Sequence, residues 1–120
     1  MEVVNLADKF SRFTECWSPK IVGEVNEMHV KLVKLQGEFV WHHHAQEDEL
    51  FLVVAGRLRM RLRSGDREVG PGEFIVVPMG TEHCPVALTA EVHVLLLEPK
   101  TTLNTGNVTN ERTVATLERL

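Results

Sequence analysis

Alternation of hydrophobic and polar residues is the main pattern in the middle of the chain. It is clearest at 57–63, where Leu58, Met60 and Leu62 alternate with four arginines. Successive side chains of a β-strand point to opposite faces, so this pattern predicts a strand with one buried face. Further strands, rich in Val, Ile and Leu, are predicted at 21–25, 28–35, 39–44, 50–55, 74–77 and 91–97.

Turn-forming residues separate these predicted strands. Ser-Gly-Asp at 64–66 predicts a hairpin turn, and Gly-Pro-Gly at 70–72 predicts another turn. Many short strands with little helix indicate an all-β sandwich or barrel. The segments 50–55 and 92–97 are apolar on both faces. We therefore expect more than one buried surface, which either a dimer interface or a covering loop would explain.

Helix signals occur only near the two ends of the chain. Asn5 can cap a short helix over 6–13, which puts Leu6, Phe10 and Phe13 on one side. A polar tail begins at about residue 99. Within it, apolar residues three apart permit a short terminal helix at 111–120.

The chain has 120 residues, which predicts one domain over 1–120 with a core barrel at about 21–98. The net charge is −4, so the chain as a whole lacks the basic footprint of a nucleic-acid-binding protein. The alternating arginines at 57–63 invite a nucleic-acid or phosphate interpretation. A solvated sheet face, whose like charges discourage edge pairing, is the preferred alternative.

The cysteines and the N-terminus bear on the compartment. Cys16 and Cys84 have no CxxC spacing, which fits a reducing environment. The N-terminus shows no signal peptide, and no apolar run approaches the roughly 20 residues that span a bilayer. We expect a cytoplasmic protein with no membrane association.

The candidate chemistry lies at His42-His43-His44 and the carboxylates that follow. Strand alternation would place His42 and His44 on one face and His43 on the other. Glu49 is far enough along the chain to begin a neighbouring strand, and His83 could enter from a third. Three imidazoles and one carboxylate would suit a divalent Fe, Mn, Ni, Cu or Zn ion with open coordination positions.

Two spaced motifs contain these residues. The first is HxH at 42–44, then Glu49 after four residues, then Gly56 after six more. The second runs from Gly72 through Pro78-Met79-Gly80 to His83. Together they resemble the two motifs of a small single-domain cupin. The resemblance implies a double-stranded β-helix (jelly-roll-like) barrel, a metal bound by His42, His44, Glu49 and His83, and a homodimer.

Two departures from the family pattern concern detail around the motifs. Four residues, one fewer than usual, separate Gly37 from His42, and Ala87 stands where the second motif ends in asparagine. That asparagine is not one of the family's usual metal ligands. Its loss therefore leaves the four predicted ligands in place.

Several other residues have a structural and a functional interpretation, and the structural one is preferred for each. His43 is expected to point outward or into an interface unless a register slip or bulge reverses it. Glu47 and Asp48 are expected in a solvated turn, with orientation of an imidazole as the alternative. Cys84 is expected to be an inert thiol, and Cys16 a small core or surface residue. His29 and His93 are expected to be structural.

The larger apolar side chains are expected in the core or the pocket wall: Phe39, Trp41, Phe51, Met60 and Phe74. Phe51, which has the parity of Glu49, is expected to line the cavity, and Met60 is a further candidate for its lining.

The function that follows is a metal-dependent enzyme acting on a small polar molecule. Proteins that the chain resembles include oxygenases, isomerases and lyases, and the ligand set does not choose among them. No second inward carboxylate stands out and the chain has no tyrosine, which weighs against isomerisation by proton transfer. The alternatives are a non-catalytic small-ligand sensor and, least favoured, a storage protein.

Overall fold

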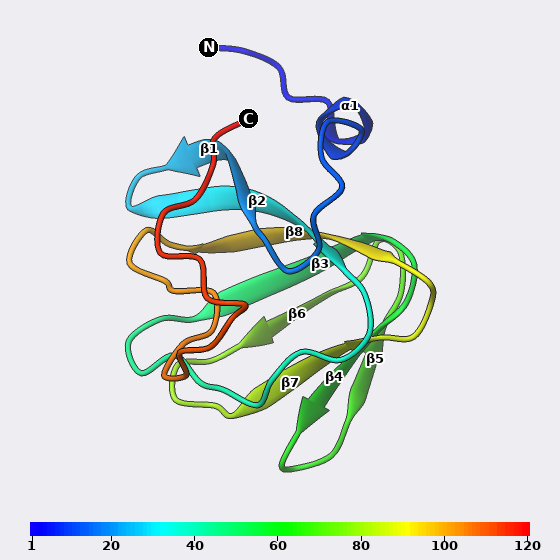
Figure 1. Ribbon diagram of the computed structural model, residues 1–120, viewed down its shortest axis with the longest axis vertical. Coiled ribbons are helices and arrows are strands. Elements are labelled where there is room, and N and C mark those ends of the chain that lie inside the picture. Colours follow the sequence, from blue (N-terminus) through cyan, green and yellow to red (C-terminus); the bar gives the residue numbers. More distant parts are fainter.

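A computed structural model describes residues 1–120 and shows a jelly-roll barrel with one short helix (Figure 1). The elements are α1 Leu6–Phe10, β1 Lys20–Val25, β2 Met28–Leu35, β3 Glu49–Ala55, β4 Leu58–Leu62, β5 Arg67–Val69, β6 Phe74–Val77, β7 His83–Ala87 and β8 Val92–Pro99. They form a five-stranded sheet in the order β1-β2-β8-β3-β6 and a three-stranded sheet in the order β5-β4-β7. All strand pairs are antiparallel, and the all-β prediction is confirmed.

The core lies between the two sheets and follows the alternation seen in the sequence. In β4, Leu58 and Met60 are fully buried while the intervening arginines face outward. In β8, every second residue from Val92 to Glu98 is buried. Each apolar side chain of this size removed from water contributes about 1.5–3 kcal/mol. The alternation of single strands thus becomes a two-sided core once the sheets meet.

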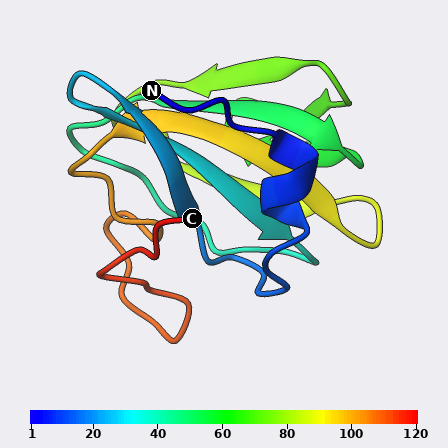
Figure 2. The ribbon, with the colours of Figure 1, turned by 90° about the horizontal axis from the view of Figure 1, so that it is seen from above.

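A second, smaller cluster lies on the outer face of the five-stranded sheet. Phe10 and Phe13 pack there against Leu32, and Figure 2 shows α1 crossing this face. The helix is capped by Asn5, as predicted, but ends at Phe10 rather than at Phe13. The Lys34 ammonium binds the Phe13 carbonyl oxygen at 2.6 Å, and this contact holds Phe13 on the sheet. The N-terminal segment therefore covers one end of the apolar outer face.

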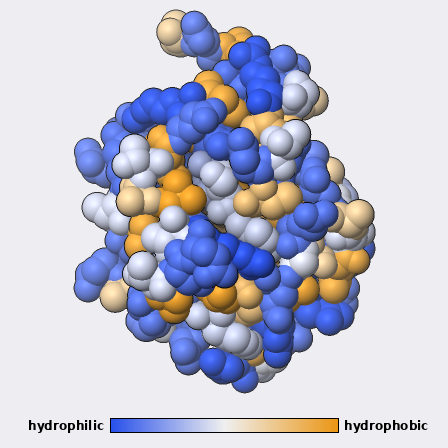
Figure 3. Space-filling model, viewed as in Figure 1, coloured by the Kyte–Doolittle hydropathy of each residue, from blue (hydrophilic) through white to orange (hydrophobic).

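The short terminal helix that the sequence permits at 111–120 does not form. Residues 100–120 form mainly turns and bends and lie along one side of the barrel (Figure 1), where hydrophilic and hydrophobic residues are mixed at the surface (Figure 3). Their end pairs with the edge of β1, because Ile21 N donates to Glu118 O and Leu120 N donates to Ile21 O, both at 2.9 Å. Pairing to an open strand edge outweighs the weak helix preference of a short polar segment. No helix of the structure is long and apolar enough to cross a membrane.

The C-terminal segment makes its closest approach to the barrel at Gly106. A side chain there would collide with the His43 carbonyl oxygen and crowd the His42 ring, and the glycine has φ of +57°. Gly72 has φ of +81° but open space around it. Because Gly106 combines a left-handed backbone with close contact to the histidine loop, it fixes how near residues 101–107 can come to the histidines.

Replacement of Gly106 by alanine should therefore destabilise the protein more than the same change at Gly72. Both variants carry the strain of a positive φ, and Gly106→Ala adds a steric cost of about 1–3 kcal/mol. Urea unfolding of both variants measures the difference. Equal losses of stability would show that the C-terminal segment is not packed against His43.

Candidate metal centre

The histidine run lies in an extended loop, and the predicted strand over 39–44 is wrong. The segment has only isolated bridges: His42 exchanges two backbone hydrogen bonds with His83, at 3.0 and 2.9 Å. On its other side, Asn107 N donates to His43 O at 3.1 Å, and His43 N donates to the Asn107 side chain at 2.9 Å. Pairing on two sides keeps the chain extended, so His42 and His44 are buried while His43 is half-buried.

Two strand ends supply the other predicted ligands. Glu49 is the first residue of β3 and His83 the first residue of β7. One donor atom from each of His42, His44, Glu49 and His83 can be chosen so that all lie within 4.8 Å of one another. All four side chains are buried, with at most 4% of each residue exposed. The structure therefore brings together the four residues that the sequence motifs single out.

The Glu49 carboxylate lies at the centre of this cluster. Its Oε1 is 2.8 Å from His44 Nε2 and 3.2 Å from His83 Nε2. These three buried atoms nevertheless have no partner with hydrogen-bond geometry. Ligand atoms bound to one ion at about 2.1 Å lie no more than about 4.2 Å apart, so only a small inward movement is needed. The donor set fits a divalent transition metal ion.

Backbone carbonyls orient two of the imidazoles. The ring Nδ1 of His42 lies 2.9 Å from Val40 O, and that of His83 lies 2.9 Å from Thr81 O. A carbonyl can only accept, so each Nδ1 carries the proton and each Nε2 presents its lone pair to the centre. This arrangement fixes the tautomer and orientation that metal binding needs.

The protonation states also suit a cation. Burial, followed by the neighbouring His83, lowers the pKa of His42 to about 4. Burial alone would raise the pKa of Glu49, but the Glu98 carboxyl and the His44 and His83 imidazoles bring it well below its usual value. Neutral imidazoles and an ionised carboxylate are the forms that bind metal.

Glu98 is a second inward carboxylate that the sequence analysis missed. It is 1% exposed, and its Oε1 accepts a hydrogen bond from the buried ammonium of Lys31 at 2.7 Å. Burial, then the neighbouring Glu49, raises the pKa of Glu98 well above its usual value against the opposing effect of Lys31. Glu98 falls on the same strand face as Val92, Val94 and Leu96, which could have indicated that its side chain points inward. The predicted strand ended at 97, whereas β8 extends to Pro99, so Glu98 was not counted on that face.

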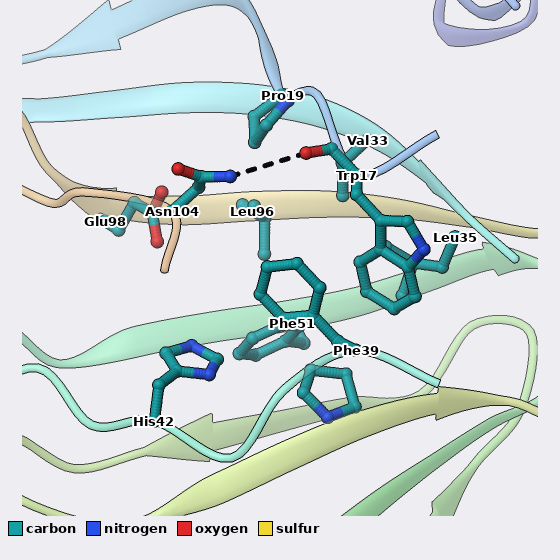
Figure 4. A pocket seen from close by; sticks show the side chains of 11 residues that line it. Trp17, Pro19, Val33, Leu35, Phe39, His42, Phe51, Leu96, Glu98 and Asn104 are labelled. Carbon is teal, nitrogen blue, oxygen red and sulfur yellow. Dashed lines mark hydrogen bonds between the residues drawn. The ribbon is translucent and has the colours of Figure 1, made fainter. Parts of the chain in front are cut away.

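A narrow cavity adjoins the cluster, and aromatic rings form much of its wall (Figure 4). The volume within which the centre of a water molecule can move is about 40 Å³. Its lining residues are Trp17, Pro19, Val33, Leu35, Phe39, His42, Phe51, Pro85, Leu96, Glu98 and Asn104. The expectation for Phe51 is thus met.

Met60 lies in the core, one of the two places expected for it, and does not line this cavity. Two other expectations about large side chains need correction. Trp41 lies outside the barrel, where the Arg63 guanidinium sits 3.7 Å from its ring centre. Phe74 is 62% exposed because β6 is an edge strand whose outer face has no cover. Whether a strand lies at a sheet edge, and whether another element packs on it, depends on the assembled sheets. The alternation within one strand therefore could not predict it.

The acidic loop and the cysteines take structural roles. Glu47 accepts a hydrogen bond from the Thr101 hydroxyl and Asp48 one from Met79 N, both at 2.8 Å, so neither holds an imidazole. Cys84 is buried, and burial followed by the nearby Glu38 raises the pKa of its thiol to about 11. Cys16 is partly buried, and both cysteines are free. An inert Cys84 is the outcome that the sequence predicted.

The remaining polar candidates also have structural partners. His93 stacks on Phe10 with ring centres 4.5 Å apart, and His29 lies 3.8 Å from a Glu24 oxygen. In the arginine row, Arg61 pairs with Glu38 at 2.7 Å and Arg63 with Glu82 at 3.5 Å. Nearby carboxylates thus engage part of that face, as expected for a solvated sheet surface.

Loss of one predicted ligand should abolish tight metal binding. His44→Ala is expected to weaken Zn²⁺ binding by more than the roughly 10- to 100-fold that loss of an outer partner costs. His43→Ala, a change to the adjacent imidazole outside the cluster, is the matched control and should bind normally. Isothermal titration of chelator-treated protein makes the comparison. Equal affinity of the two variants would exclude His44 as a ligand.

The metal-free protein should lose stability in acid through His42. Its pKa falls from 6.5 to about 4 on folding, so between these values the unfolded chain binds more protons. Stability from this group therefore decreases as pH falls through that window, by roughly 3 kcal/mol in all. Urea unfolding from pH 7 to pH 4.5 should show a shallower decrease for His42→Asn than for the unchanged protein. The same slope for both would contradict the assignment.

Comparison with known proteins agrees with this geometry. The family model described as "Cupin domain" matches residues 28–98. The chain is 44% identical to a cupin-2 domain-containing protein from Shewanella frigidimarina, over 82% of this chain and 95% of that one, with a TM-score of 0.79. It is also similar to a sugar phosphate isomerase of the cupin superfamily from Silicibacter pomeroyi, at 26% identity, 64% and 53% coverage and a TM-score of 0.56.

A curated relative gives a shorter match. The uncharacterized protein YdbB of Bacillus subtilis is 36% identical over 63 residues, and the match spans 52% of this chain and 56% of YdbB. The family match covers more than half of the chain and includes all four predicted ligands, from His42 to His83. The chain therefore belongs to the cupin family.

Proposed function

We propose that the protein binds one divalent transition metal ion, Mn, Fe, Ni, Zn or Cu, through His42, His44, Glu49 and His83 and acts as an enzyme on a small polar molecule. The observation that carries this proposal is the convergence of four buried donor atoms beside a cavity. A bound ion would supply Lewis-acid chemistry at its open coordination positions.

The protein's own residues would select and orient the ligand. Phe39 and Phe51 form apolar walls of the cavity next to His42. The Glu98 carboxyl adds a second acid–base group to the same wall. Proton transfer, as in an isomerase or lyase, therefore has a candidate partner that the sequence did not reveal, and oxygenase chemistry stays a third option.

The lining of the cavities bears on the substrate. Neither the cavity at Phe51 nor the neighbouring hollow between His43 and Asn107 is lined by lysine or arginine. Phosphate groups are usually bound by such side chains or by helix N-termini. The cavity thus favours an unphosphorylated ligand, in contrast to the sugar phosphate isomerase with which the chain shares its fold.

A non-catalytic ligand-binding protein is the second candidate. The small volume and the mostly apolar wall would also suit a sensor that holds its ligand without turnover. Metal-dependent binding with no product formation would favour this alternative.

Metal removal tests the proposed function. Protein prepared without chelators should contain about one transition metal ion per chain, and metal removal should abolish both ligand binding and turnover until metal is restored. Elemental analysis, oxygen uptake with catechols, thiols or diketones, and product assays measure this. Sugar phosphates serve as the contrasting substrates. The proposal would be overturned if the metal-free protein bound any of these test compounds as tightly, or converted it as fast, as the metal-loaded protein does.

We also propose a homodimer formed through the exposed outer face of β6 and its neighbours. Phe74 is 62% and Val76 47% exposed, and the sheet register places them beside Leu52 and Leu50. These residues continue across β3 to Leu95 and Leu97 of β8. The apolar surface extends beyond the end covered by α1, which supports association with a second copy.

Charge placed on this face should weaken the dimer. Phe74→Glu is expected to shift the protein toward monomer, because a dimer would bury the new carboxylate without a partner. Met79→Glu is the control, since Met79 is 53% exposed in a loop. Light scattering coupled to size-exclusion chromatography gives the mass. If the protein without either substitution is a monomer, the homodimer proposal is wrong.

A further inference from the structure

A hollow with a basic lining lies on the side of the barrel where the C-terminal segment runs beside β1 and the start of β2 (Figure 1). The volume within which the centre of a water molecule can move there is about 300 Å³. Its basic lining residues are His29, Lys31, Lys100 and Arg119, and no aspartate or glutamate lines it. The cavity beside the predicted metal ligands has no lysine or arginine in its wall. The hollow therefore suits an anion, which that cavity does not.

The Lys31–Glu98 pair separates the two cavities. Lys31 lines the hollow and Glu98 lines the cavity beside the predicted ligands, and Lys31 Nζ is 2.7 Å from Glu98 Oε1. None of the four predicted metal ligands lines the hollow. A ligand in the hollow would therefore be held by side chains and not by a metal ion.

Glu24 fixes two of the basic side chains in place. Its Oε2 accepts a hydrogen bond from Lys100 Nζ at 2.9 Å, and its Oε1 accepts one from Arg119 Nη2 at 2.7 Å. These contacts lower the pKa of Glu24 to about 2, so its carboxylate stays ionised at neutral pH. Each cation keeps further N–H donors free. One carboxylate thus positions two cations from separate segments and leaves positive charge for a ligand.

His29 is a buried imidazole with no hydrogen-bond partner. The residue is 9% exposed, and its Nδ1 is buried without a partner. Its Nε2 is 3.8 Å from Glu24 Oε1, beyond hydrogen-bond distance. Buried polar side chains are normally paired. Since His29 lines the hollow, an anion bound there would lie against an imidazole that has no other partner.

We propose that this hollow is a second ligand site, which binds free phosphate or the phosphate group of a small molecule between Lys100 and Arg119, against His29. Lysine and arginine are the usual phosphate ligands, and arginine matches the geometry of phosphate oxygens. Donors from β2, from the end of β8 and from the C-terminal segment surround the hollow, which favours a tetrahedral dianion over a flat carboxylate. Ile21 and Leu117 also line it and would contact the carbon part of a phosphate ester.

Inorganic phosphate is the probe for this site, added to the full chain as purified and followed by NMR at constant ionic strength. The backbone amide signals of residues 29–31, 100–102 and 115–119 should shift and saturate together. The same affinity is expected after the metal has been removed with a chelator. Acetate, a carboxylate probe, should bind at least about tenfold more weakly, because it forms fewer charge-assisted hydrogen bonds.

Two substitutions test the proposed phosphate contacts. Arg119→Met and Lys100→Met should each weaken phosphate binding about tenfold, the value of one hydrogen bond to a charged group. The two residues belong to different segments, so a local disturbance of the chain end cannot explain a loss in both. Arg12→Met is the matched control, because Arg12 is also exposed and pairs with a carboxylate, Asp8, at 2.8 Å. It should leave phosphate binding unchanged.

Three results would overturn the proposal. Phosphate shifts that vanish on metal removal would place the anion on the metal ion. Equal losses in Arg12→Met and Arg119→Met would show attraction to surface charge in general, and acetate binding as tight as that of phosphate would exclude a phosphate site.

Glycerol phosphate separates the two sources of the phosphate group. Tighter binding than inorganic phosphate, with shifts that extend to Ile21 and Leu117, would support a phosphorylated small molecule. Equal binding at the same residues would support free phosphate as the ligand.

Discussion

A buried chain of three ionisable groups, Lys31, Glu98 and Glu49, is the constraint around which the site is built. Each ion removed from water costs several kcal/mol unless its neighbours compensate. Lys31 can balance one of the two carboxylates, and the pKa directions indicate that Glu98 holds a proton while Glu49 stays ionised. The barrel therefore keeps the negative charge of Glu49 beside the imidazoles of His42, His44 and His83. A divalent cation is the partner that this environment suits best.

The strands deliver these groups because the core and the site share one interior. Lys31 from β2, Glu98 from β8 and Glu49 from β3 belong to adjacent strands of the five-stranded sheet, and all three point inward. The same alternation that buries Leu96 and Phe51 places the carboxylates at one end of the barrel. Polar positions at the end of apolar strands thus turn part of a hydrophobic core into a site that could hold a metal ion.

The C-terminal segment completes the arrangement from outside the two sheets. Asn107 pairs with both backbone groups of His43, and Gly106 lets the chain approach closely enough to do so. Asn104, from the same segment, forms part of the cavity wall. These residues lie beyond the part of the chain that matches the family model. Residues outside the family match thereby form part of the wall around the four predicted ligands.

The amino-acid sequence by itself determined the strand alternation, the turns and the four predicted ligands. These features depend on local periodicity and on two spaced motifs, as Leu58, Met60 and the HxH pair illustrate. Tertiary structure decided what depends on distant partners. His42 to His44 became a loop pinned by β7 and Asn107, residues 111–120 paired with β1 instead of forming a helix, and Phe74 remained uncovered. Glu98 acquired its place beside Glu49 through the register of β8, since burial next to a charge is a property of packed strands and not of a single one.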